Sequence, residues 1–213
     1  MINHQLYTTA PFARWLWLVR RNVRVRWAFA LLVACFSLLL LSPVSSAQAD
    51  AGRFNGKVIF MRHALAPGFG DPDNFDIKDC STQRNLDETG RQQARAIGKR
   101  LRESGIKFGA IYSSYWCRCL ETAQLLGLGP VRPFSGLNSF FQSYAPRQET
   151  LAKLKDEIAS LPKDGKPILM VTHFVTISAI TGLGVNSGEM AMLDLETGNS
   201  RAISLAAFGG VTN

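Results

Sequence analysis

Apolar runs alternate with amphipathic stretches along the chain from residue 57 onward. The runs are short and rich in valine, isoleucine, leucine and phenylalanine, as buried strands are. The stretches between them place apolar residues three or four apart or end in glycine, which is typical of helices. The predicted strands occupy residues 57–61, 108–114, 131–134 and 167–173. The predicted helices occupy residues 86–105, 116–129, 148–161 and 174–182.

Two segments depart from this alternation. Residues 190–208 are expected to form a hairpin that turns at Thr197-Gly198-Asn199, and residues 63–85 lack apolar periodicity and are expected to form a long loop. Long loops in compact domains are commonly functional. The alternation of strands and helices predicts an α/β fold, a three-layer α/β/α sandwich around a mainly parallel central sheet.

Polar residues lie at the predicted carboxyl ends of three strands. Arg62 and His63 follow the first strand, Ser113 and Ser114 end the second, and His173 ends a later one. Ligands of parallel sheets bind beyond these strand ends. One histidine at a strand end is commonly a packed core residue, but the chain from residue 50 onward has only these two, at equivalent positions. Their joint placement predicts a functional site.

Residues 1–49 have the features of an export signal. Five arginines and no acidic residue precede residue 50, and the apolar residues 27–42 are followed by Ala47-Gln48-Ala49, which is typical of a cleavage site. We expect a signal peptide that is cleaved after Ala49, or an uncleaved N-terminal anchor. In either case, residues 50–213 would form a domain that is periplasmic or secreted, or anchored to the membrane and facing the periplasm.

The charge balance argues against a nucleic-acid partner. The chain has a formal net charge of +8, but five of its 24 basic residues belong to the export segment. The remaining 19 basic and 16 acidic residues leave a net charge of +3 from residue 50 onward. Such a mild excess does not predict a basic binding face.

Three cysteines remain outside the export segment: Cys80, Cys117 and Cys119. Disulfides persist in an oxidising compartment, and an odd number of cysteines allows at most one bridge within the chain. The Cys-Arg-Cys spacing lacks a second cysteine pair and a nearby histidine. We therefore expect no metal site, and the sequence indicates no cofactor.

The histidines and arginines suit phosphoryl transfer. A neutral imidazole is a nucleophile near pH 7 and can accept a phosphoryl group. The transferred group is strongly negative, so catalysis depends on positioned cationic donors, and the arginine fork matches phosphate oxygens. Arg62 adjoins His63, and Arg118 lies early in the helix after the second strand, where helix amides also favour an anion. His173 can supply further donors.

Four blocks in this order resemble the histidine phosphatase superfamily, branch 1, which has the phosphoglycerate mutase-like fold. They are "FMRHA", with Ala64 where glycine is usual, "LDETGRQQARAIGKRL", "IYSSYWCRCLETA" and "MVTHFVTISAITG". The resemblance implies that His63 is the phosphorylated nucleophile. It also implies that Arg62, Arg118 and His173 form the phosphate pocket.

One departure concerns the proton donor. The family often has a glutamate where "GLNSFF" places Ser139. Two sources of a replacement carboxyl group remain open: Glu189, or the aspartates of the long loop, which are Asp71, Asp73, Asp76 and Asp79. A phosphohistidine substrate would need little protonation. The export signal instead resembles that of periplasmic members of the superfamily that act on phosphate groups of lipopolysaccharide sugars.

The resemblance also implies that the loop segment "DCSTQRNL" folds over the pocket. Arg84 is then a further phosphate contact, with the hydroxyls of Ser81 and Thr82 near the substrate. A disulfide from Cys80 to Cys117 or Cys119 would join this loop to the helix that carries Arg118. The aromatic residues Phe140, Phe141 and Tyr144 are expected to pack in the core or lid.

The sequence thus predicts an exported, metal-independent phosphatase that acts through phospho-His63. Its substrate would be a phosphorylated small molecule, an envelope glycolipid or a phosphoprotein. The alternative is a catalytically weak or inactive protein of the same fold that binds a phosphate ligand. Mutase activity is disfavoured by the missing acid and the export signal.

Overall fold

The computed structural model of the chain describes residues 52–208. The predicted export segment, residues 1–49, lies outside these described residues, as does the proposed cleavage site. Within residues 52–208, no helix combines the length and the apolar character needed to span a membrane.

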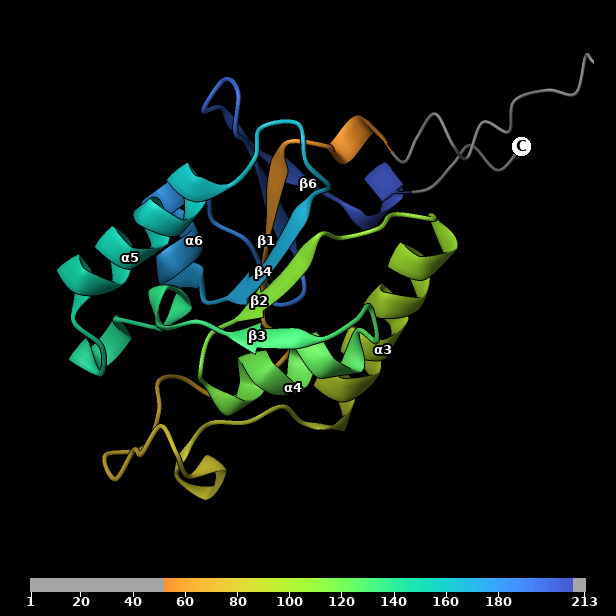
Figure 1. Cartoon of the computed structure of the whole chain (residues 1–213). Helices are drawn as coiled ribbons and strands as arrows, with labels where there is room; N and C mark the ends of the chain where they lie inside the picture. Colours follow the sequence, from red (N-terminus) through yellow and green to blue (C-terminus); the bar gives the residue numbers. More distant parts are fainter. Residues whose placement is uncertain (1–51, 209–213) are drawn as a thin grey trace, which may run out of the picture. The chain divides into compact units, whose positions relative to one another are not determined.

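A six-stranded sheet, in the order β3-β2-β4-β1-β5-β6, forms the centre of residues 52–208 (Figure 1). The first four of these strands run parallel, whereas β5 is antiparallel to both β1 and β6. The strands are β1 (Lys57–Arg62), β2 (Ala110–Ser113), β3 (Val131–Pro133), β4 (Ile168–Thr172), β5 (Met190–Asp194) and β6 (Ser200–Ile203). The predicted, mainly parallel sheet is confirmed.

Four α-helices cover the two faces of the sheet. Helices α3 (Glu88–Glu103) and α4 (Cys117–Leu125) lie on one face, and α5 (Arg147–Ser160) and α6 (Phe174–Thr181) lie on the other (Figure 1). In strand β1, alternate side chains point to opposite faces of the sheet and contact the helices on each face. Ile59 and Met61 pack in the core with residues of α3 and α4, whereas Val58 and Phe60 pack with residues of α5 and α6. A strand buried on both faces reads as a continuous apolar run.

Five 3₁₀ helices complete the described chain: η1 (Gly52–Phe54), η2 (Cys80–Thr82), η3 (Ser135–Leu137), η4 (Phe141–Ser143) and η5 (Leu205–Phe208). The prediction of a hairpin through residue 208 was wrong at its end. The second arm stops at Ile203, and η5 follows because Phe208 turns inward to stack on Phe54, with ring centroids 4.7 Å apart. This aromatic contact closes the core beside the hairpin.

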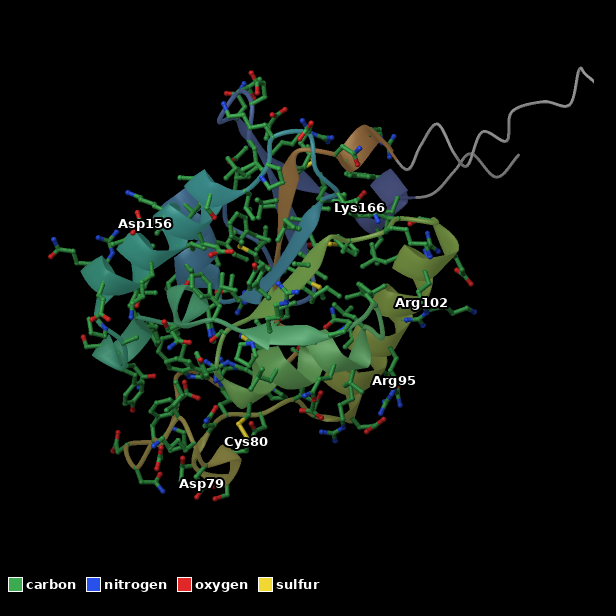
Figure 2. All side chains as sticks on the ribbon, viewed as in Figure 1. Asp79, Cys80, Arg95, Arg102, Asp156 and Lys166 are labelled. Carbon is green, nitrogen blue, oxygen red and sulfur yellow. A yellow bond between two sulfur atoms is a disulfide. The ribbon has the colours of Figure 1, made fainter. Side chains whose placement is uncertain are left out.

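The long loop runs from His63 to the N-cap of α3. Asp87 accepts a hydrogen bond from the backbone of Gly90 and so begins the helix. The one helical element of the loop is the short 3₁₀ helix η2, and the loop passes the start of α4. Figure 2 shows Cys80 on this segment, where its sulfur joins Cys117 of α4. The disulfide therefore ties the loop to the helix that carries Arg118.

Candidate active site

The sheet register brings the predicted histidines together. Arg62 of β1 pairs with Thr172 of β4, so the residues that follow, His63 and His173, leave the sheet side by side. Their ring centroids are 5.5 Å apart. Both side chains are buried, at 2% and 3% exposure. Two strands that end level thus place two imidazoles in one pocket.

The hydrogen bonds of His63 define which ring nitrogen is free to react. Its Nδ1 lies 2.8 Å from the carbonyl oxygen of Ala64, which can only accept, so Nδ1 carries the proton. The guanidinium Nε of Arg118 donates to His63 Nε2 at 3.3 Å. Because an arginine can only donate, Nε2 holds a lone pair. An unprotonated ring nitrogen of this kind can act as a nucleophile.

His173 is oriented by a chain of polar groups. Its Nδ1 lies 3.5 Å from Arg118 Nη2, which can only donate, so Nδ1 holds a lone pair and Nε2 carries the proton. The Nε2–H group donates a hydrogen bond to Ser114 Oγ at 3.0 Å. Ser114 Oγ donates in turn to Asn138 Oδ1 at 3.3 Å. The thiol of Cys119 lies 3.4 Å from the same Nε2. These contacts hold the ring with Nδ1 toward Arg118.

Arg118 lies at the centre of the site and is paired with Asp71. Arg118 Nη1 and Nη2 donate to the two carboxylate oxygens of Asp71 at 2.7 and 3.1 Å. The carboxylate also accepts from the indole of Trp116 and from the backbone N–H of Arg84, each at 3.0 Å. This bidentate geometry fixes the plane of the guanidinium. It leaves Nε and the second Nη2 hydrogen directed at the two imidazoles.

Asp71 is therefore ill-suited to act as the replacement acid. Burial raises the pKa of its carboxyl group, but the hydrogen bond and charge of Arg118 outweigh that effect and hold the pKa below its usual value. A carboxylate that accepts four hydrogen bonds has no proton to give. Asp71 was one of several open candidates for the acid, and the loop instead turns it inward to pair with Arg118. Asp73, Asp76 and Asp79 are exposed and do not line the pocket.

Two further arginines line the pocket. Arg62 donates from Nη1 to the carbonyl of Val185 at 3.2 Å, and its buried Nε has no acceptor within residues 52–208. Arg84 donates from Nε to Gly70 O at 2.8 Å and from Nη1 to Ala66 O. Both lie on the cavity that also holds His63. The structure thus brings all three arginines of the predicted phosphate pocket together.

The cavity between these groups has a volume of about 320 Å³. One part of its lining is cationic, imidazole or hydroxyl: Arg62, His63, Arg84, Arg118, Ser139 and His173. The other part is glycine or apolar: Gly68, Phe69, Gly70, Phe141, Phe174 and Val175. Ser139, at the position where the family often has its acid, is buried in this lining. None of the described residues that line the cavity carries a carboxyl group.

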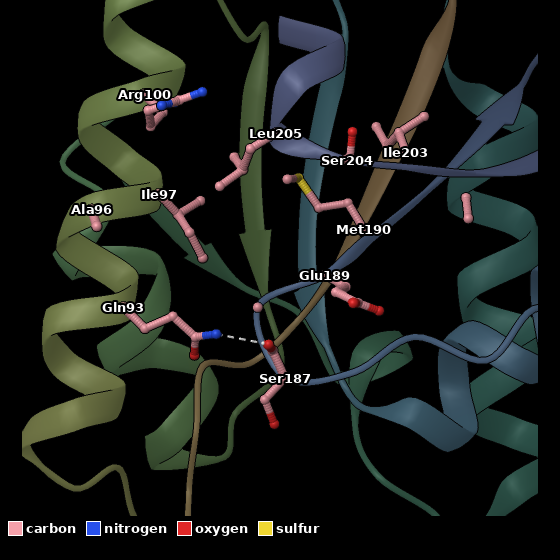
Figure 3. A pocket seen from close by; sticks show the side chains of 12 residues that line it. Gln93, Ala96, Ile97, Arg100, Ser187, Glu189, Met190, Ile203, Ser204 and Leu205 are labelled. Atoms are coloured by element: carbon pink, nitrogen blue, oxygen red, sulfur yellow. Dashed lines mark hydrogen bonds between the residues drawn. The ribbon is translucent and has the colours of Figure 1, made fainter.

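Glu189, the other candidate acid, lies outside this cavity. Its side chain is exposed and accepts a hydrogen bond from the backbone of Asn186 at 2.8 Å. Glu189 lines a different cavity of about 880 Å³ between α3 and the β5–β6 hairpin (Figure 3). There, Gln93 donates to the carbonyl of Ser187. Glu189 is nevertheless a neighbour of Arg62, because its carbonyl oxygen accepts from the backbone N–H of Arg62 at 3.0 Å. The structure keeps its side chain out of the cavity that holds the four predicted catalytic residues.

The loop is fastened to α4 beside Arg118. Cys80 is joined to Cys117, one of the two pairings that were expected, and Cys119 keeps a free, buried thiol. Burial raises the pKa of that thiol to about 12. Gln83 Oε1 accepts from the backbone N–H of Cys117 at 2.9 Å. The loop is thus anchored to α4 at two points between Asp71 and Arg84.

Two loop hydroxyls that we expected near the substrate are used elsewhere. Ser81 donates to Asp79, and Thr82 donates to loop carbonyls while accepting from the backbone of Asp76. Neither residue lines the cavity. The prediction that Ser81 and Thr82 lie near the substrate was wrong, because both hydroxyl groups form hydrogen bonds within the loop around η2.

Both active-site histidines are neutral in the free protein. Burial lowers the pKa of His63 to about 3, with the nearby positive charge of Arg118 adding to the effect. Burial and Arg118 likewise place the pKa of His173 well below its usual value. The His63 ring is thus unprotonated across the physiological range.

Residues 58–140 match the model of the histidine phosphatase superfamily (branch 1). The mitochondrial serine/threonine-protein phosphatase Pgam5 of Drosophila pseudoobscura pseudoobscura is 35% identical over 93 residues, or 41% of this chain and 32% of that protein. The match therefore spans about a third of the length of this relative.

Two solved structures show a shared fold. A protein encoded by an open reading frame of Mycobacterium tuberculosis is 17% identical, with a TM-score of 0.51 over 70% of this chain and 95% of the other. A mycobacterial glucosyl-3-phosphoglycerate phosphatase, in complex with VO3, is 19% identical, with a TM-score of 0.50 over 69% of this chain and 96% of the other. Residues 58–140 thus resemble the histidine phosphatase superfamily (branch 1), and the two structures show that the fold, which is phosphoglycerate mutase-like, is shared.

The Asp71–Arg118 pair predicts a large effect from a small substitution. Asp71→Asn keeps the shape but turns an amide N–H₂ toward groups that all donate, and it leaves Arg118 buried without a counter-charge. We expect the free energy of unfolding to fall by about 2–4 kcal/mol, measured by urea denaturation. Asp73→Asn, at an exposed site in the same loop, should change it by less than about 0.5 kcal/mol. Equal stabilities of the two variants would contradict the pairing.

The lowered histidine pKa values predict how stability changes with pH. Between about pH 6.5 and pH 5, the unfolded chain binds protons on these imidazoles while the folded chain does not. The unfolding free energy should therefore fall as the pH falls through this window. The variant His63→Asn, which has no titrating ring at this position, should show a shallower fall in denaturation midpoints measured at both pH values. A slope unchanged by this substitution would show that His63 titrates normally.

Proposed function

We propose that this protein is an exported phosphatase that hydrolyses phosphomonoesters, or phosphohistidine, through a phosphohistidine intermediate on His63. The observation that carries the proposal is the geometry of the His63 ring. Its Nδ1–H is held by Ala64 O, and its Nε2 lone pair faces the Arg118 guanidinium in a buried cavity. A packed structural histidine would have no need of a cationic cavity in front of its lone pair.

The pocket can bind a phosphate group without large rearrangement. The Arg118 N–H groups that now meet the imidazoles can turn their hydrogen bonds to phosphate oxygens, and the unpartnered Nε of Arg62 gains an acceptor. A bound dianion would raise the pKa of His173, since it opposes the positive charges that lower it. His173 would then donate a hydrogen bond to the phosphate from its protonated Nδ1.

The reaction would run in two displacements. His63 Nε2 attacks phosphorus, a P–N bond forms, and the ester P–O bond breaks with its electron pair on the leaving oxygen. Water then attacks the phosphohistidine, the P–N bond breaks, and the electron pair returns to Nε2 with release of inorganic phosphate. Throughout, Arg62, Arg84 and Arg118 would offset the charge on the equatorial oxygens, which is the main form of catalysis in phosphoryl transfer.

The disulfide supports the proposal of export. Cys80–Cys117 holds the loop that supplies Asp71 and Arg84, and such a bridge persists in oxidising compartments. The arginine-rich and apolar order of residues 1–49 supports the same conclusion. We therefore propose a periplasmic or secreted location for the domain.

A second function fits the same pocket. Because the cavity lining in the described part of the chain holds no carboxyl group, a protein that binds phosphate esters and does not turn them over is the alternative. The two functions differ in their need for His63. Binding requires the arginines, whereas hydrolysis also requires the nucleophile.

Replacement of His63 separates the two functions. We expect His63→Ala to lower kcat/KM for 4-nitrophenyl phosphate by about 10³-fold or more, since the covalent route is lost. Glu103→Gln, at an exposed side chain of α3 that does not line the cavity, should stay within about threefold of the wild type, and EDTA should leave the rate unchanged. Hydrolysis that persists in His63→Ala would contradict the proposal that the protein is a phosphatase acting through His63. Binding of phosphate esters with no turnover by the wild type would favour the alternative.

A further inference from the structure

Exposed aromatic side chains gather at the mouth of the phosphate cavity. Five large hydrophobic side chains are exposed in the described part of the chain: Leu65, Phe69, Tyr115, Phe141 and Phe174. Three of them, Phe69, Phe141 and Phe174, line this one cavity. Phe69 is 89% exposed, which leaves nearly a whole ring in water. A group of exposed apolar residues at a polar pocket marks a ligand surface.

The three rings have a defined arrangement. Phe69 and Phe141 meet edge to face, with centroids 5.1 Å apart and an interplanar angle of 84°. Phe174 lies under the guanidinium of Arg62, with the guanidinium carbon 5.7 Å from the ring centroid. This arrangement joins the aromatic rim to the phosphate-binding end of the cavity.

The backbone that presents this rim is locally strained. Gln142 and Ser143, directly after Phe141, both have positive φ angles, of 58° and 62°. Residues other than glycine adopt this conformation at a cost, and such residues cluster at functional sites. The Gln142 side chain accepts from the backbone N–H of Asp71 at 2.8 Å. The turn that carries Phe141 is thus bonded to the loop that carries Phe69.

The two ends of the cavity define the shape of a ligand. One end offers arginines and imidazoles to a phosphate, and the other offers aromatic faces and edges to an apolar ring. A volume of about 320 Å³ is at the small end of ligand sites. A single aromatic ring with one phosphate group fits that size, whereas a long lipid chain would extend far beyond it.

The lining also bears on the leaving group. The described lining holds no carboxyl group, and its one hydroxyl group, that of Ser139, is a poor proton donor. A leaving oxygen that departs readily as an anion suits this pocket. A phenol leaves as a resonance-stabilised phenolate, whereas an alkyl alcohol needs a proton as it leaves.

We infer that the substrate is an aryl phosphomonoester, whose ring packs among Phe69, Phe141 and Phe174 while His63 takes its phosphoryl group. This assignment rests on the proposed function. The P–O bond breaks with its electron pair on the phenolic oxygen, which then takes a proton from water. The phosphohistidine is hydrolysed by a second water. The phenolic phosphate can belong to a small molecule or to a phosphotyrosyl side chain.

Binding of unreactive analogues tests the rim without any contribution from leaving-group chemistry. Titration calorimetry with the wild type should show that phenylphosphonate binds at least about 10-fold more tightly than methylphosphonate. Phe69→Ala and Phe141→Ala should each remove most of that difference and leave methylphosphonate binding unchanged. Tyr115→Ala, at an exposed aromatic residue outside the cavity, should keep the full difference. Equal affinities of the wild type for both phosphonates would overturn the assignment.

Turnover tests the same assignment and distinguishes the two sources of a phenolic phosphate, a small molecule and a phosphotyrosyl side chain. The wild type should hydrolyse phenyl phosphate with a kcat/KM at least about 100-fold above that for glycerol 3-phosphate. Phe69→Ala should raise KM for phenyl phosphate more than it lowers kcat. A higher kcat/KM for a phosphotyrosyl peptide than for phenyl phosphate would identify the side chain as the source, and the reverse would identify a small molecule.

The remaining outcomes separate the two proposals. Equal turnover of aryl and alkyl phosphates, or a preference for farnesyl phosphate, would overturn the aryl assignment and leave the phosphatase intact. Hydrolysis of none of these esters would contradict the proposed function itself. In that case, a preference for phenylphosphonate would show a site that binds aromatic phosphate analogues without catalysis. Both the phosphatase proposal and the assignment of an aryl substrate would then be contradicted.

Discussion

The buried pair of Arg118 and Asp71 is the interaction on which the rest of the site depends. A guanidinium at 3% exposure is stable only with a counter-charge and filled hydrogen bonds, and Asp71 supplies both. The bidentate contact orients the plane of Arg118, so that its remaining N–H groups meet the two imidazoles. The same positive charge helps to keep both rings neutral. One ion pair thus sets the geometry of the candidate site and helps to set the protonation of its two imidazoles.

The sheet and the loop bring this pair to the right place. Parallel strands β1, β4 and β2 end level, and this register aligns the residues that follow them. Asp71, however, belongs to a loop with no regular structure of its own apart from η2. The disulfide from Cys80, the side chain of Gln83 and the indole of Trp116 together hold that loop against α4. A rigid sheet and a fastened loop therefore share the construction of the pocket.

The sequence predicted what local patterns encode. Buried strands and amphipathic helices have distinct periodicities, and the rule that ligands lie beyond parallel strand ends then located His63, Arg118 and His173. The loop carries no such period. Nothing in its sequence distinguishes Asp71, which turns inward to Arg118, from Asp73, Asp76 and Asp79, which stay exposed.

Tertiary placement also explains the other differences. Glu189 contacts Arg62 through its backbone carbonyl, but its side chain lines another cavity beside α3. Phe141, expected in the core or lid, lies at the cavity mouth, because its turn brings its ring against that of Phe69. The end of the hairpin depends on the contact of Phe208 with Phe54, which is distant in the sequence. Each of these outcomes rests on contacts between distant segments, which a local pattern does not contain.

The central claim is that His63 Nε2 is the atom that takes the phosphoryl group. The most direct test is to mix the protein with a labile aryl phosphate, stop the reaction within milliseconds in alkali, where phosphohistidine survives, and locate the phosphate by mass spectrometry and ³¹P NMR. The account predicts one phosphate per chain on His63, attached at Nε2, because Nδ1 is engaged by the carbonyl of Ala64. Phosphate attached at Nδ1, phosphate on His173, or turnover with no phosphorylated histidine would contradict it.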